Sequence, residues 1–559
     1  MKFLDARRLT GPNLHFDEPA AVLDVECTTE EAAAFIPAWR AAVEGYWSAL
    51  GEPGPAFSRI DLDGGISLAF TAPIDALYTA SEVNEQAFID VTGLPTAEPA
   101  ERSLDTLREA LAEEHNSALL ALQKEAGARD VPFFWDDDEA SLGMGRHSAV
   151  WPVRELPGIG DVDWASHRDI PVGLVTGTNG KTTTVRLARH ILRGAGLHVG
   201  VSSTDWIAID DTILDRGDWS GPGGARAVLR QPAADVGVLE AARGGLLRRG
   251  LGVESAAAAV ITNIAADHLG DFGSRNLDEL LAIKWVVTRA VSGSGRLILN
   301  AEDQRLVRQA AGFAGEVVWF SLDAALPLIR AHIGQGGIAY VLRDGDLVRL
   351  AGGAETSLCV AADIPITLGG AARHNVANAL AAAALAFELG AGAAQVRAGL
   401  QSMSQDANPG RCNVYAIGER HVLVDFAHNP QAMRALFDMA RALPARRRAL
   451  CFGQAGDRPD ALIREMTRDA WAIGLDRVYI SELADYRRGR EAGAVYAVIR
   501  DELLRLGAQP GAIEHHELES ESFGAAMDWA GDGDLVIMLA LGSYGTIREQ
   551  IDTLIRATG

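Results

Sequence analysis

A short glycine-containing segment carries the clearest chemistry of this sequence. Residues 177–183 read Gly-Thr-Asn-Gly-Lys-Thr-Thr and directly follow an apolar, strand-like run. Such a loop turns its backbone N–H groups toward a phosphate, while the lysine neutralises the anion and a threonine hydroxyl reaches a divalent cation. The common eight-residue phosphate loop needs glycine where Val175 stands, so this is a shorter form. The sequence therefore predicts a nucleotide-phosphate site at Lys181 and Thr182.

Three further polar residues lie farther along the chain, at the ends of apparent strands or on a nearby helix. Glu240 and His268 each follow an apolar, strand-like segment, and Lys284 falls in a helical pattern that begins near residue 277. Taken singly, Glu240 would more readily be a salt-bridge partner, and His268 a buried core histidine. Together with the phosphate loop they predict a Mg²⁺ site, because carboxylate and imidazole groups beside a triphosphate are ligands that this cation accepts.

The elements that would hold these residues alternate between strands and helices. Apolar segments such as 235–239 and 257–262 are typical of strands, with helical patterns between them. That alternation indicates a parallel sheet with crossover helices, and ligands bind at the carboxyl ends of such strands. We therefore expect an α/β fold in which the phosphate loop, Glu240 and His268 share one edge of a sheet.

The chain is long enough for several domains, and its patterns indicate three. Residues 1–165 are expected to form a separate α+β unit, with one long helix over 103–127 and no glycine-loop or metal signature. Residues 166–405 would form the central α/β unit that carries the phosphate loop. Residues 406–559 would form a second α/β unit.

Composition and charge narrow the classes of partner. Hydrophobic residues make up 48% of the chain, as in a globular protein, and the net charge of −24 opposes binding to nucleic acid or anionic lipid. The four cysteines lack the paired spacing of a metal site and are expected to be free thiols. The charged N-terminus lacks a signal-peptide core, and the alanine-rich stretch 376–387 is too short to span a bilayer. We therefore expect a cytoplasmic protein with no membrane partner.

Six motifs in chain order resemble those of the Mur ligases, ATP-dependent enzymes that form amide bonds in peptidoglycan, folylpolyglutamate and cyanophycin synthesis. The resemblance covers about residues 170–559. It implies the Mur-ligase architecture, in which a central P-loop ATPase domain with a parallel sheet precedes a Rossmann-like α/β domain. The motifs are 177–183, Glu240, Thr262 and Asn263 with Asp267 and His268, 374–378, 409–411 and 425–430.

The resemblance also implies how ATP and Mg²⁺ would be held. Lys181 and the loop amides would bind the β- and γ-phosphates, and Thr182, Glu240 and His268 would bind metal. Lys284 stands where the family carries a carbamylated lysine, which would act as a carboxylate-like ligand for a second Mg²⁺. The alternative for Lys284 is an ordinary surface lysine.

Other motifs would complete the nucleotide site. Asn375 and Asn378 would contact the adenine side, and Arg411 and Asp425 would reach the nucleotide from the third unit. The site would then be complete only after domain closure, which excludes water. The implied nucleotide-binding set is Gly177, Thr178, Asn179, Gly180, Lys181, Thr182, Thr183, Asn375, Asn378, Arg411, Asp425 and His428.

The implied reaction has two steps. A carboxylate attacks the γ-phosphorus of ATP while Lys181 and Mg²⁺ offset the crowding of negative charge. An amine then attacks the acyl phosphate, which gives an amide, ADP and phosphate. Lys181, Glu240, His268 and Lys284 form the implied catalytic set, with His268 a metal ligand in preference to a proton acceptor.

Within the family, the sequence most resembles the Mur-ligase-like part of cyanophycin synthetases. Residues 239–251 and 300–303 carry this likeness, and residues 8–13 resemble the opening of the N-terminal domain of those enzymes. Cyanophycin synthetases hold an ATP-grasp domain between these parts, for which this chain has no room, so one ligation centre is expected instead of two. Trp206 stands where glycine is expected and would either reshape the acceptor pocket or pack on a neighbour.

Three functions stay open at this point. The first is a ligase that joins an amino acid or short peptide to the carboxylate of an acidic amino acid or peptide. Arg487, Arg488 and Arg490 would hold a carboxylate unless they form a solvated loop. The second is a cell-wall or polyglutamate ligase, although residues 1–165 carry no nucleotide-sugar signature. The third is a non-catalytic ATP-binding partner of a full-length cyanophycin synthetase. A homo-oligomer is possible in each case.

Overall fold

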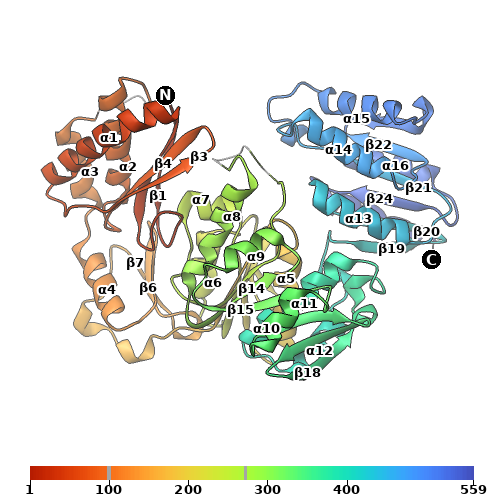
Figure 1. Cartoon of the computed structure of the whole chain (residues 1–559), viewed down its shortest axis with the longest axis horizontal. Helices are drawn as coiled ribbons and strands as arrows, with labels where there is room; N and C mark the ends of the chain where they lie inside the picture. The colour runs from red at the N-terminus through yellow and green to blue at the C-terminus, as the bar shows by residue number, and fades with distance from the viewer. Residues whose placement is uncertain (97–101, 268, 270–273, 559) are drawn as a thin grey trace.

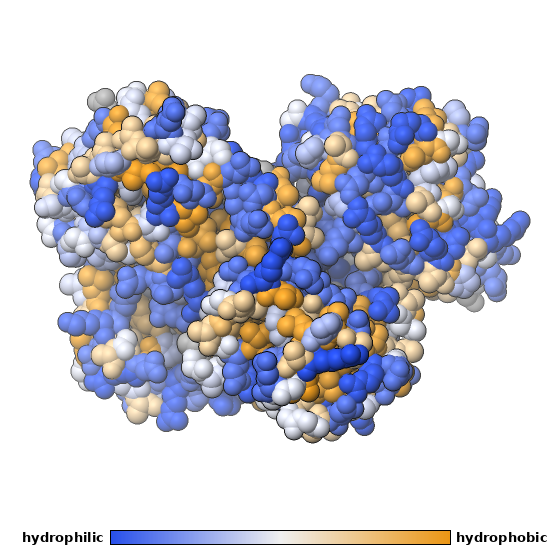
Figure 2. Space-filling view, in the orientation of Figure 1, coloured by the Kyte–Doolittle hydropathy of each residue, from blue (hydrophilic) through white to orange (hydrophobic). Residues whose placement is uncertain are grey.

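Four β-sheets organise the part of the chain that the computed structural model describes, which is residues 1–96, 102–267, 269 and 274–558. The central sheet has 11 strands, the C-terminal sheet has 6, and the N-terminal unit holds sheets of 4 and 3. In Figure 1 the N-terminal unit (red to orange) and the C-terminal unit (blue) lie on either side of the central unit. The space-filling view shows a notch between the two outer units, with hydrophobic and hydrophilic residues interspersed over this face (Figure 2).

An antiparallel sheet of order β1-β2-β4-β3 forms the heart of the N-terminal unit. Helix α1 buries residues that recur every three or four positions, so that one face packs on the sheet. Trp39, Trp47, Phe70 and Phe88 fill the core between them. The elements are β1 (Lys2–Leu9), β2 (Ala20–Glu26), α1 (Thr29–Ala49), β3 (Phe57–Leu62), β4 (Gly65–Thr71), α2 (Leu77–Thr92), α3 (Leu104–Glu114), α4 (Ser117–Ala128), β5 (Phe133–Trp135), β6 (Glu139–Leu142) and β7 (Ala149–Pro152).

The single helix expected over 103–127 is wrong, because the chain forms two helices there, α3 and α4. The Asn116 side chain caps α4 by accepting from the Leu119 N–H at 3.0 Å. The Asn116 N–H in turn donates to Asp75 Oδ2 at 2.8 Å. Capping satisfies an N–H group that a helix start would otherwise leave unpaired. The cap and the tertiary contact with Asp75 therefore stabilise a break that helical periodicity alone does not reveal.

The expected α/β fold of the central unit is confirmed. Strands β9-β12-β8-β13-β14-β15-β16 pair in parallel, and antiparallel strands that were not expected complete both edges. The elements are β8 (Val172–Thr176), α5 (Lys181–Gly194), β9 (Val199–Ser202), β10 (Trp206–Ile209), β11 (Thr212–Arg216), α6 (Pro222–Leu229), β12 (Val236–Glu240), α7 (Arg243–Arg249), β13 (Ala256–Ile261), α8 (Leu277–Trp285), β14 (Val291–Asn300), α9 (Gln304–Ala310), β15 (Glu316–Ser321), α10 (Pro327–Gly334), β16 (Ile338–Arg343), β17 (Asp346–Ala351), β18 (Ala354–Val360), α11 (Arg373–Glu388) and α12 (Ala393–Ser402).

Apolar packing covers both faces of the parallel strands, as is usual for such sheets. Neighbouring residues of β8 enter different cores, since Leu174 lies in one apolar cluster and Val175 in another. The second cluster also holds the buried residues of α5 and of the alanine-rich α11, which confirms the packed helix expected near 376–387. Within the described residues, no helix is both long and apolar enough to cross a membrane.

The C-terminal unit repeats the α/β pattern on a smaller sheet. Its strand order is β19-β20-β24-β21-β22-β23, and all its pairs are parallel except β19 with β20. The elements are β19 (Asn413–Ile417), β20 (Arg420–Asp425), α13 (Pro430–Ala442), β21 (Arg448–Phe452), α14 (Asp460–Trp471), β22 (Arg477–Ser481), α15 (Ala494–Arg505), β23 (Ile513–His516), α16 (Glu519–Trp529), β24 (Leu535–Leu539) and α17 (Tyr544–Thr558).

Main-chain hydrogen bonds join the N-terminal unit to the helices that flank the phosphate loop. The Leu251 N–H, just after α7, donates to Pro12 O at 2.7 Å. The Asp63 N–H donates to Glu279 Oε1 in α8 at 2.7 Å. Since α8 also carries Lys284, the N-terminal unit braces a helix that supplies a candidate site residue.

Candidate functional site

The phosphate loop connects β8 to α5 through two glycines at which the structure leaves no room for a side chain. Gly177 and Gly180 have φ angles of +139° and +86°, a range that L residues rarely adopt. A Cβ on Gly177 would lie 1.9 Å from Thr262 Oγ1, and one on Gly180 would lie 2.2 Å from Asn378 Oδ1. Glycine at both positions therefore allows the loop to pack closely on the segment after β13 and on α11.

The segment after β13 holds the phosphate loop through side-chain hydrogen bonds. The Asn179 N–H donates to Asn263 Oδ1 at 3.0 Å, and the Thr262 hydroxyl donates to Asn179 O at 2.6 Å. Gly180 is the N-cap residue of α5 and offers no side-chain capping bond. The N–H groups of the first helical turn lack intrahelical acceptors and carry partial positive charge. A helix start that is uncapped in this way suits an anion such as phosphate.

Two lysines converge on the loop from different helices. Lys181 opens α5, and its Nζ donates to Thr178 O at 3.1 Å. Lys284 extends from α8, is only 3% exposed, and donates from Nζ to Gly177 O at 2.7 Å. Burial lowers the pKa of Lys284 well below its usual value, and the nearby charge of Lys181 lowers that pKa further. Lys284 is therefore no ordinary surface lysine, and its surroundings favour the neutral amine.

Glu240 and Thr182 meet beside the same loop. The Thr182 hydroxyl donates to Glu240 Oε2 at 3.0 Å and lies 3.2 Å from Thr204 Oγ1. Glu240 ends β12 and is 2% exposed, and its Oε1 has no hydrogen-bond partner among the described residues. Burial raises the pKa of Glu240, although the positive charge of Lys181 opposes that shift. The buried acceptor oxygen Glu240 Oε1 is therefore suited to an electropositive ligand.

This pair fits a hard cation such as Mg²⁺. A buried polar atom without a partner costs about 1–3 kcal/mol, and a bound cation would remove that cost at Glu240 Oε1. No group of three or more His, Cys, Asp or Glu side chains that could hold a metal occurs in the described part of the chain. Mg²⁺ commonly takes one or two carboxylates and completes its octahedron with phosphate oxygens and water. The residues present therefore fit a cation that arrives with a nucleotide.

His268, predicted as a metal ligand, lies outside the described residues, but its neighbour Asp267 is described. Asp267 Oδ2 lies 3.4 Å from His428 Nε2, and Asp267 Oδ1 lies 3.6 Å from the Arg458 guanidinium. Both partners belong to the C-terminal unit. The segment that carries Asp267 therefore meets the C-terminal unit beside the loop, and His428 lies at that junction.

The two asparagines predicted for the adenine side both lie in α11, near the loop. Asn378 faces Gly180, where a Cβ would lie 2.2 Å from Asn378 Oδ1. The Asn378 amide donates to Asn375 Oδ1 at 3.2 Å, and the Asn375 amide donates to Ile366 O at 2.8 Å. Asn378 therefore borders the phosphate loop directly, whereas Asn375 holds Asn378 in place.

Arg411 and Asp425 lie at the start of the C-terminal unit. The Arg411 guanidinium lies 4.6 Å from the centroid of the Phe426 ring, a cation–π distance. Asp425 Oδ2 accepts from the Cys412 N–H at 2.7 Å and from the Cys412 thiol at 3.3 Å. His374 Nε2 lies 3.1 Å from the same sulfur. These contacts link the 374–378 motif of the central unit to the aspartate of the C-terminal unit.

Side-chain amides of the C-terminal unit reach the phosphate loop itself. The Asn179 amide donates to Gln431 Oε1 at 2.7 Å, and the Asn429 amide donates to Asn179 Oδ1 at 2.8 Å. Asn429 also caps α13 by accepting from the Ala432 N–H at 3.0 Å. The C-terminal unit therefore contacts the loop in this structure, and the loop is covered from that side.

Four residues at or near the site were not singled out from the sequence: Thr204, Arg186, Gln431 and Arg458. Arg186 carried a usable signal, because it is a charged residue on the buried face of α5. Gln431 stands directly after the 425–430 motif and could have been included with it. Thr204 and Arg458 lie in connections where no periodicity predicts which way a side chain points.

Contacts in the structure bear on two alternatives that the sequence left open. Trp206 packs within the second apolar cluster, and the Arg189 guanidinium lies 5.7 Å from its ring centroid. This favours packing on a neighbour over a role in the acceptor pocket. Arg490 donates to Gly456 O at 2.6 Å and to Arg458 O at 2.5 Å. Arg490 is therefore engaged in holding the segment after β21.

Family models match both α/β units of the chain. The model described as the Mur ligase middle domain matches residues 175–386. The model described as the Mur ligase glutamate ligase domain matches residues 410–542. The phosphate loop and Glu240 fall within the first match, and Arg411 and Asp425 fall within the second.

Whole-chain comparisons find ligases. Cyanophycin synthetase of Trichormus variabilis is 38% identical over 373 residues, which are 66% of this chain and 41% of that protein. The chain thus spans about two fifths of that relative's length. UDP-N-acetylmuramyl-tripeptide synthetase of Deinococcus radiodurans is 30% identical over 404 residues, or 69% of this chain and 76% of that protein. E. coli FolC in complex with DHPP and ADP has a TM-score of 0.51 at 21% identity, over 68% of this chain and 89% of that chain, which is a likeness in fold.

Proposed function

Because the chain belongs to the Mur ligase family, we propose that it is an ATP-dependent, ADP-forming ligase that joins a carboxylate to an amine through an acyl phosphate. The observation that carries this proposal is the convergence of four groups on one glycine loop. Lys181 and Lys284 donate to the loop carbonyls, and the Thr182 hydroxyl meets a buried carboxylate, Glu240, that has one oxygen unpaired among the described residues.

The loop residues hold the triphosphate. The N–H groups at the start of α5 face the anion, and Lys181 exchanges its bond to Thr178 O for the β- and γ-phosphates. Thr182 and Glu240 would hold Mg²⁺, which neutralises phosphate charge when bound. Asn378, which borders Gly180, would contact the adenine side of the nucleotide, and Arg411 and Asp425 would reach the nucleotide from the C-terminal unit.

The chemistry has two bond exchanges. An oxygen of the acceptor carboxylate attacks the γ-phosphorus, the bond between that phosphorus and the β,γ-bridging oxygen breaks, and ADP leaves with the electron pair. The amine nitrogen then attacks the acyl carbon, the carbon–oxygen bond to phosphate breaks, and the amine gives up a proton. Lys181 stabilises the charge that gathers on the transferred phosphoryl oxygens.

Lys284 is proposed to act as a carbamate. A neutral amine is the form that attacks CO₂, and the depressed pKa of Lys284 favours that form. The nitrogen–carbon bond forms as one proton is released, and the product carries a carboxylate-like group in place of a cation. Such a group beside the loop would serve as an oxygen ligand for a hard cation.

The C-terminal unit protects the reactive intermediate. Asn429 and Gln431 bond to Asn179 of the loop, and these contacts would limit the access of water to the γ-phosphate. Exclusion of water matters here because an acyl phosphate is readily hydrolysed.

The proposed substrates follow the cyanophycin synthetases, to which the identity is higher than to the peptidoglycan enzyme. The amine would be an amino acid or a short peptide, and the carboxylate would belong to an acidic amino acid or peptide. A cell-wall or polyglutamate ligase, and a non-catalytic ATP-binding partner, are the alternatives that the experiment below separates.

The direct test is phosphate release from ATP and Mg²⁺ with pairs of amines and acidic acceptors, read together with product mass. The acceptors include aspartate- and glutamate-containing peptides, a UDP-linked muramyl peptide and a folate. Release coupled to a new amide mass identifies the ligase and its substrates. ATP binding without release for any pair would favour the non-catalytic alternative.

Lys181→Ala is the matched inactive control for this assay. We expect a loss of at least about 100-fold in turnover, because the lysine stabilises phosphoryl charge in the transition state. Circular dichroism and the thermal midpoint should stay near those of the unchanged chain, since Lys181 makes one hydrogen bond to its own loop. Turnover that survives the substitution would contradict the site assignment.

A further inference from the structure

Helix α5 contains a buried arginine that the proposed reaction does not use. Arg186 lies one turn after Thr182 and is only 3% exposed. Its Nη2 pairs with Asp205 Oδ2 at 2.5 Å. Its Nη1 donates to Asn408 Oδ1 at 3.2 Å and to Pro409 O at 3.1 Å. One guanidinium therefore bridges two parts of the chain that are far apart in sequence.

Asn408 and Pro409 belong to the connecting segment, residues 403–412, which runs from α12 to the first strand of the C-terminal unit. Asn408 is fully buried, and its amide lies 3.4 Å from Thr183 Oγ1, as donor. The Asn413 amide donates to Asn408 O at 3.1 Å. The phosphate-loop helix thus holds the connecting segment through Arg186 and Thr183.

Asp205, the second partner of Arg186, lies next in sequence to a residue that contacts Thr182 of the phosphate loop. Asp205 follows Thr204, whose hydroxyl lies 3.2 Å from that of Thr182. Burial lowers the pKa of Arg186 to about 10, with Asp205 opposing that shift, so the guanidinium is charged at neutral pH. An arginine offers five donors in a rigid plane, whereas the ammonium of lysine is a compact point charge. The bridge therefore depends on the two separate Nη groups of the guanidinium and not on its charge alone.

We propose that Arg186 is a positioning residue that couples the phosphate loop to the connecting segment, so that nucleotide binding sets the orientation of the C-terminal unit. This inference rests on the proposed ligase function and deepens it. Arg411 lies in the connecting segment and Asp425 follows on the second strand of the C-terminal unit, so a shift of the segment displaces both groups. A displacement of about 1 Å at a reacting site can cost about 100-fold in rate.

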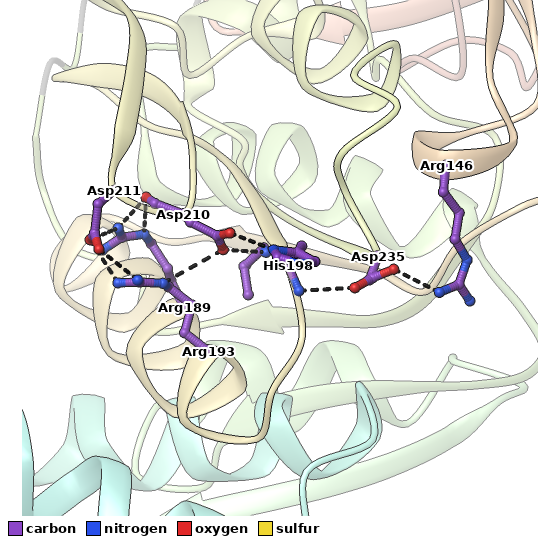
Figure 3. Close-up of polar contacts among 8 residues, drawn as sticks. Arg146, Arg189, Arg193, His198, Asp210, Asp211 and Asp235 are labelled. Carbon is purple, nitrogen blue, oxygen red and sulfur yellow. Dashed lines mark hydrogen bonds and ion pairs between the residues drawn. The ribbon is translucent and has the colours of Figure 1, made fainter.

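Two other arginines of α5 provide a contrast. In Figure 3, Arg189 and Arg193 both point toward the turn that holds Asp210 and Asp211. The Arg189 guanidinium donates to Asp210 O and lies 2.9 Å from Asp211 Oδ1, and Arg193 lies 2.6 Å from Asp211 Oδ2. Arg189→Met is therefore the matched control, because it removes an arginine from the same helix without touching the bridge.

The test compares Arg186→Lys with Arg189→Met by hydrogen exchange, with and without ADP and Mg²⁺. In the unchanged chain, nucleotide should slow exchange both in the loop, residues 177–183, and in the connecting segment. In Arg186→Lys we expect the loop to keep this protection. In the connecting segment, the protection factor that nucleotide adds should fall at least tenfold. Equal protection of the segment in Arg186→Lys and in the unchanged chain would overturn the proposal.

Kinetics provide a second readout. Arg186→Lys should lower kcat by about 10- to 100-fold and change KM for ATP by less than about threefold, since a positioning defect acts in the transition state. Arg189→Met should leave both constants unchanged. A raised KM with unchanged kcat in Arg186→Lys would instead assign the residue to ground-state nucleotide binding and overturn the coupling role.

A double-mutant cycle guards against misfolding of any one variant. If Arg186 acts through Asn408, the losses of kcat from Arg186→Lys and Asn408→Ala should not multiply. The kcat of the double variant should match that of the less active single variant within about twofold. Multiplying losses would overturn the bridge. The exchange experiment stands apart from the proposed function: absence of turnover in the unchanged chain refutes the ligase, whereas the protection pattern with ADP still decides the coupling.

Discussion

Glu240, the carboxylate proposed to bind Mg²⁺, illustrates at the scale of one residue how a buried charge is kept at a cost in stability. It is buried at the end of β12, and one of its oxygens lacks a hydrogen-bond partner among the described residues. Burial raises its pKa above 4.5, so ionisation of Glu240 makes folding less favourable as pH rises past that value. Lys181 offsets part of this cost. Bound Mg²⁺ and nucleotide would offset the rest.

We therefore predict opposite effects of Glu240→Gln on stability and on activity. In chelator at neutral pH, the variant should unfold at higher urea, with a gain of about 1–2 kcal/mol, because removing an unpaired buried charge is stabilising. The gain should vanish below about pH 4.5, where the carboxylate of the unchanged chain is neutral in both states. Turnover should fall by at least about 100-fold.

Urea unfolding with and without ATP and Mg²⁺ measures this prediction. Ligands should stabilise the unchanged chain more than the variant, since they bind the native state. A Glu240→Gln variant that is less stable than the unchanged chain in chelator would mean that Glu240 is satisfied without a cation.

Individual site residues differed in how far the sequence revealed them. Lys181 and Thr182 could be predicted because the glycine loop fixes their positions relative to the helix start. Glu240 could be predicted because it ends an apolar strand next to that loop in a parallel sheet. The direction of the Lys284 side chain, from α8 to Gly177 O, depends on how two helices pack. Sequence spacing alone carries no information on such a contact.

At the scale of elements, the N-terminal unit braces α7 through a buried polar cluster. A chain of hydrogen bonds runs through it: His15 Nε2 lies 3.0 Å from Ser67 Oγ, which donates to Asp24 Oδ1 at 2.5 Å. Arg7 pairs with Asp24 at 2.5 Å and donates from Nε to Leu247 O at 2.8 Å. The cluster therefore ties strands β1, β2 and β4 to helix α7.

This cluster predicts a loss of stability in mild acid. Burial lowers the pKa of His15 to about 4, against 6.5 unfolded, with Asp24 opposing the shift and Arg7 and Arg289 adding to it. A histidine with a lowered folded pKa stays neutral in the native state. The unfolded chain therefore binds more protons between about pH 6.5 and 4, and stability falls as pH falls through that window. The loss at pH 5 should be about 1–2 kcal/mol.

His15→Gln provides the measurement. The two ring nitrogens of His15 lie 3.0 Å from Ser58 Oγ and Ser67 Oγ. Glutamine keeps a donor and an acceptor for these serines but does not titrate, so the difference in urea stability between pH 7 and pH 5 should shrink by about 1–2 kcal/mol. An unchanged pH dependence in the variant would assign the acid sensitivity to other groups.

Strand and helix patterns predicted the middle of the central sheet better than its edges. Strands such as β12 and β13 are apolar on both faces because helices cover them, and that makes a recognisable run. Strand β11 is exposed along its whole length and has only two adjacent large apolar residues, so it lacks the longer apolar run of a buried strand. The break between α3 and α4 was missed because it depends on Asp75, which is distant in sequence.

At the scale of the whole molecule, the proposed reaction depends on contact between the C-terminal unit and the phosphate loop. Among the described residues, polar contacts join the two: Asn179 with Asn429 and Gln431, and Asp267, in the segment after β13, with His428 and Arg458. Polar contacts of this kind can open and close as substrates enter and products leave. Their proposed purpose is to keep water from the acyl phosphate.

Gln431→Ala should therefore uncouple ATP use from product formation. The variant retains Asn429, which caps α13, so the fold should persist. We expect amide formation to fall by roughly tenfold and the ratio of phosphate to amide to rise above one, because water reaches the intermediate. The matched control is Gln509→Ala, which alters an exposed glutamine of the same unit. A ratio of one in Gln431→Ala would contradict the shielding role.

The most direct test of the central claim follows an oxygen atom. The acceptor carboxylate is labelled with ¹⁸O, and the phosphate released during amide formation is analysed by mass. Attack of the carboxylate on the γ-phosphorus predicts one ¹⁸O in each released phosphate, with none in ADP. Amide product accompanied by unlabelled phosphate would contradict the acyl-phosphate mechanism and the ligase chemistry proposed for this site.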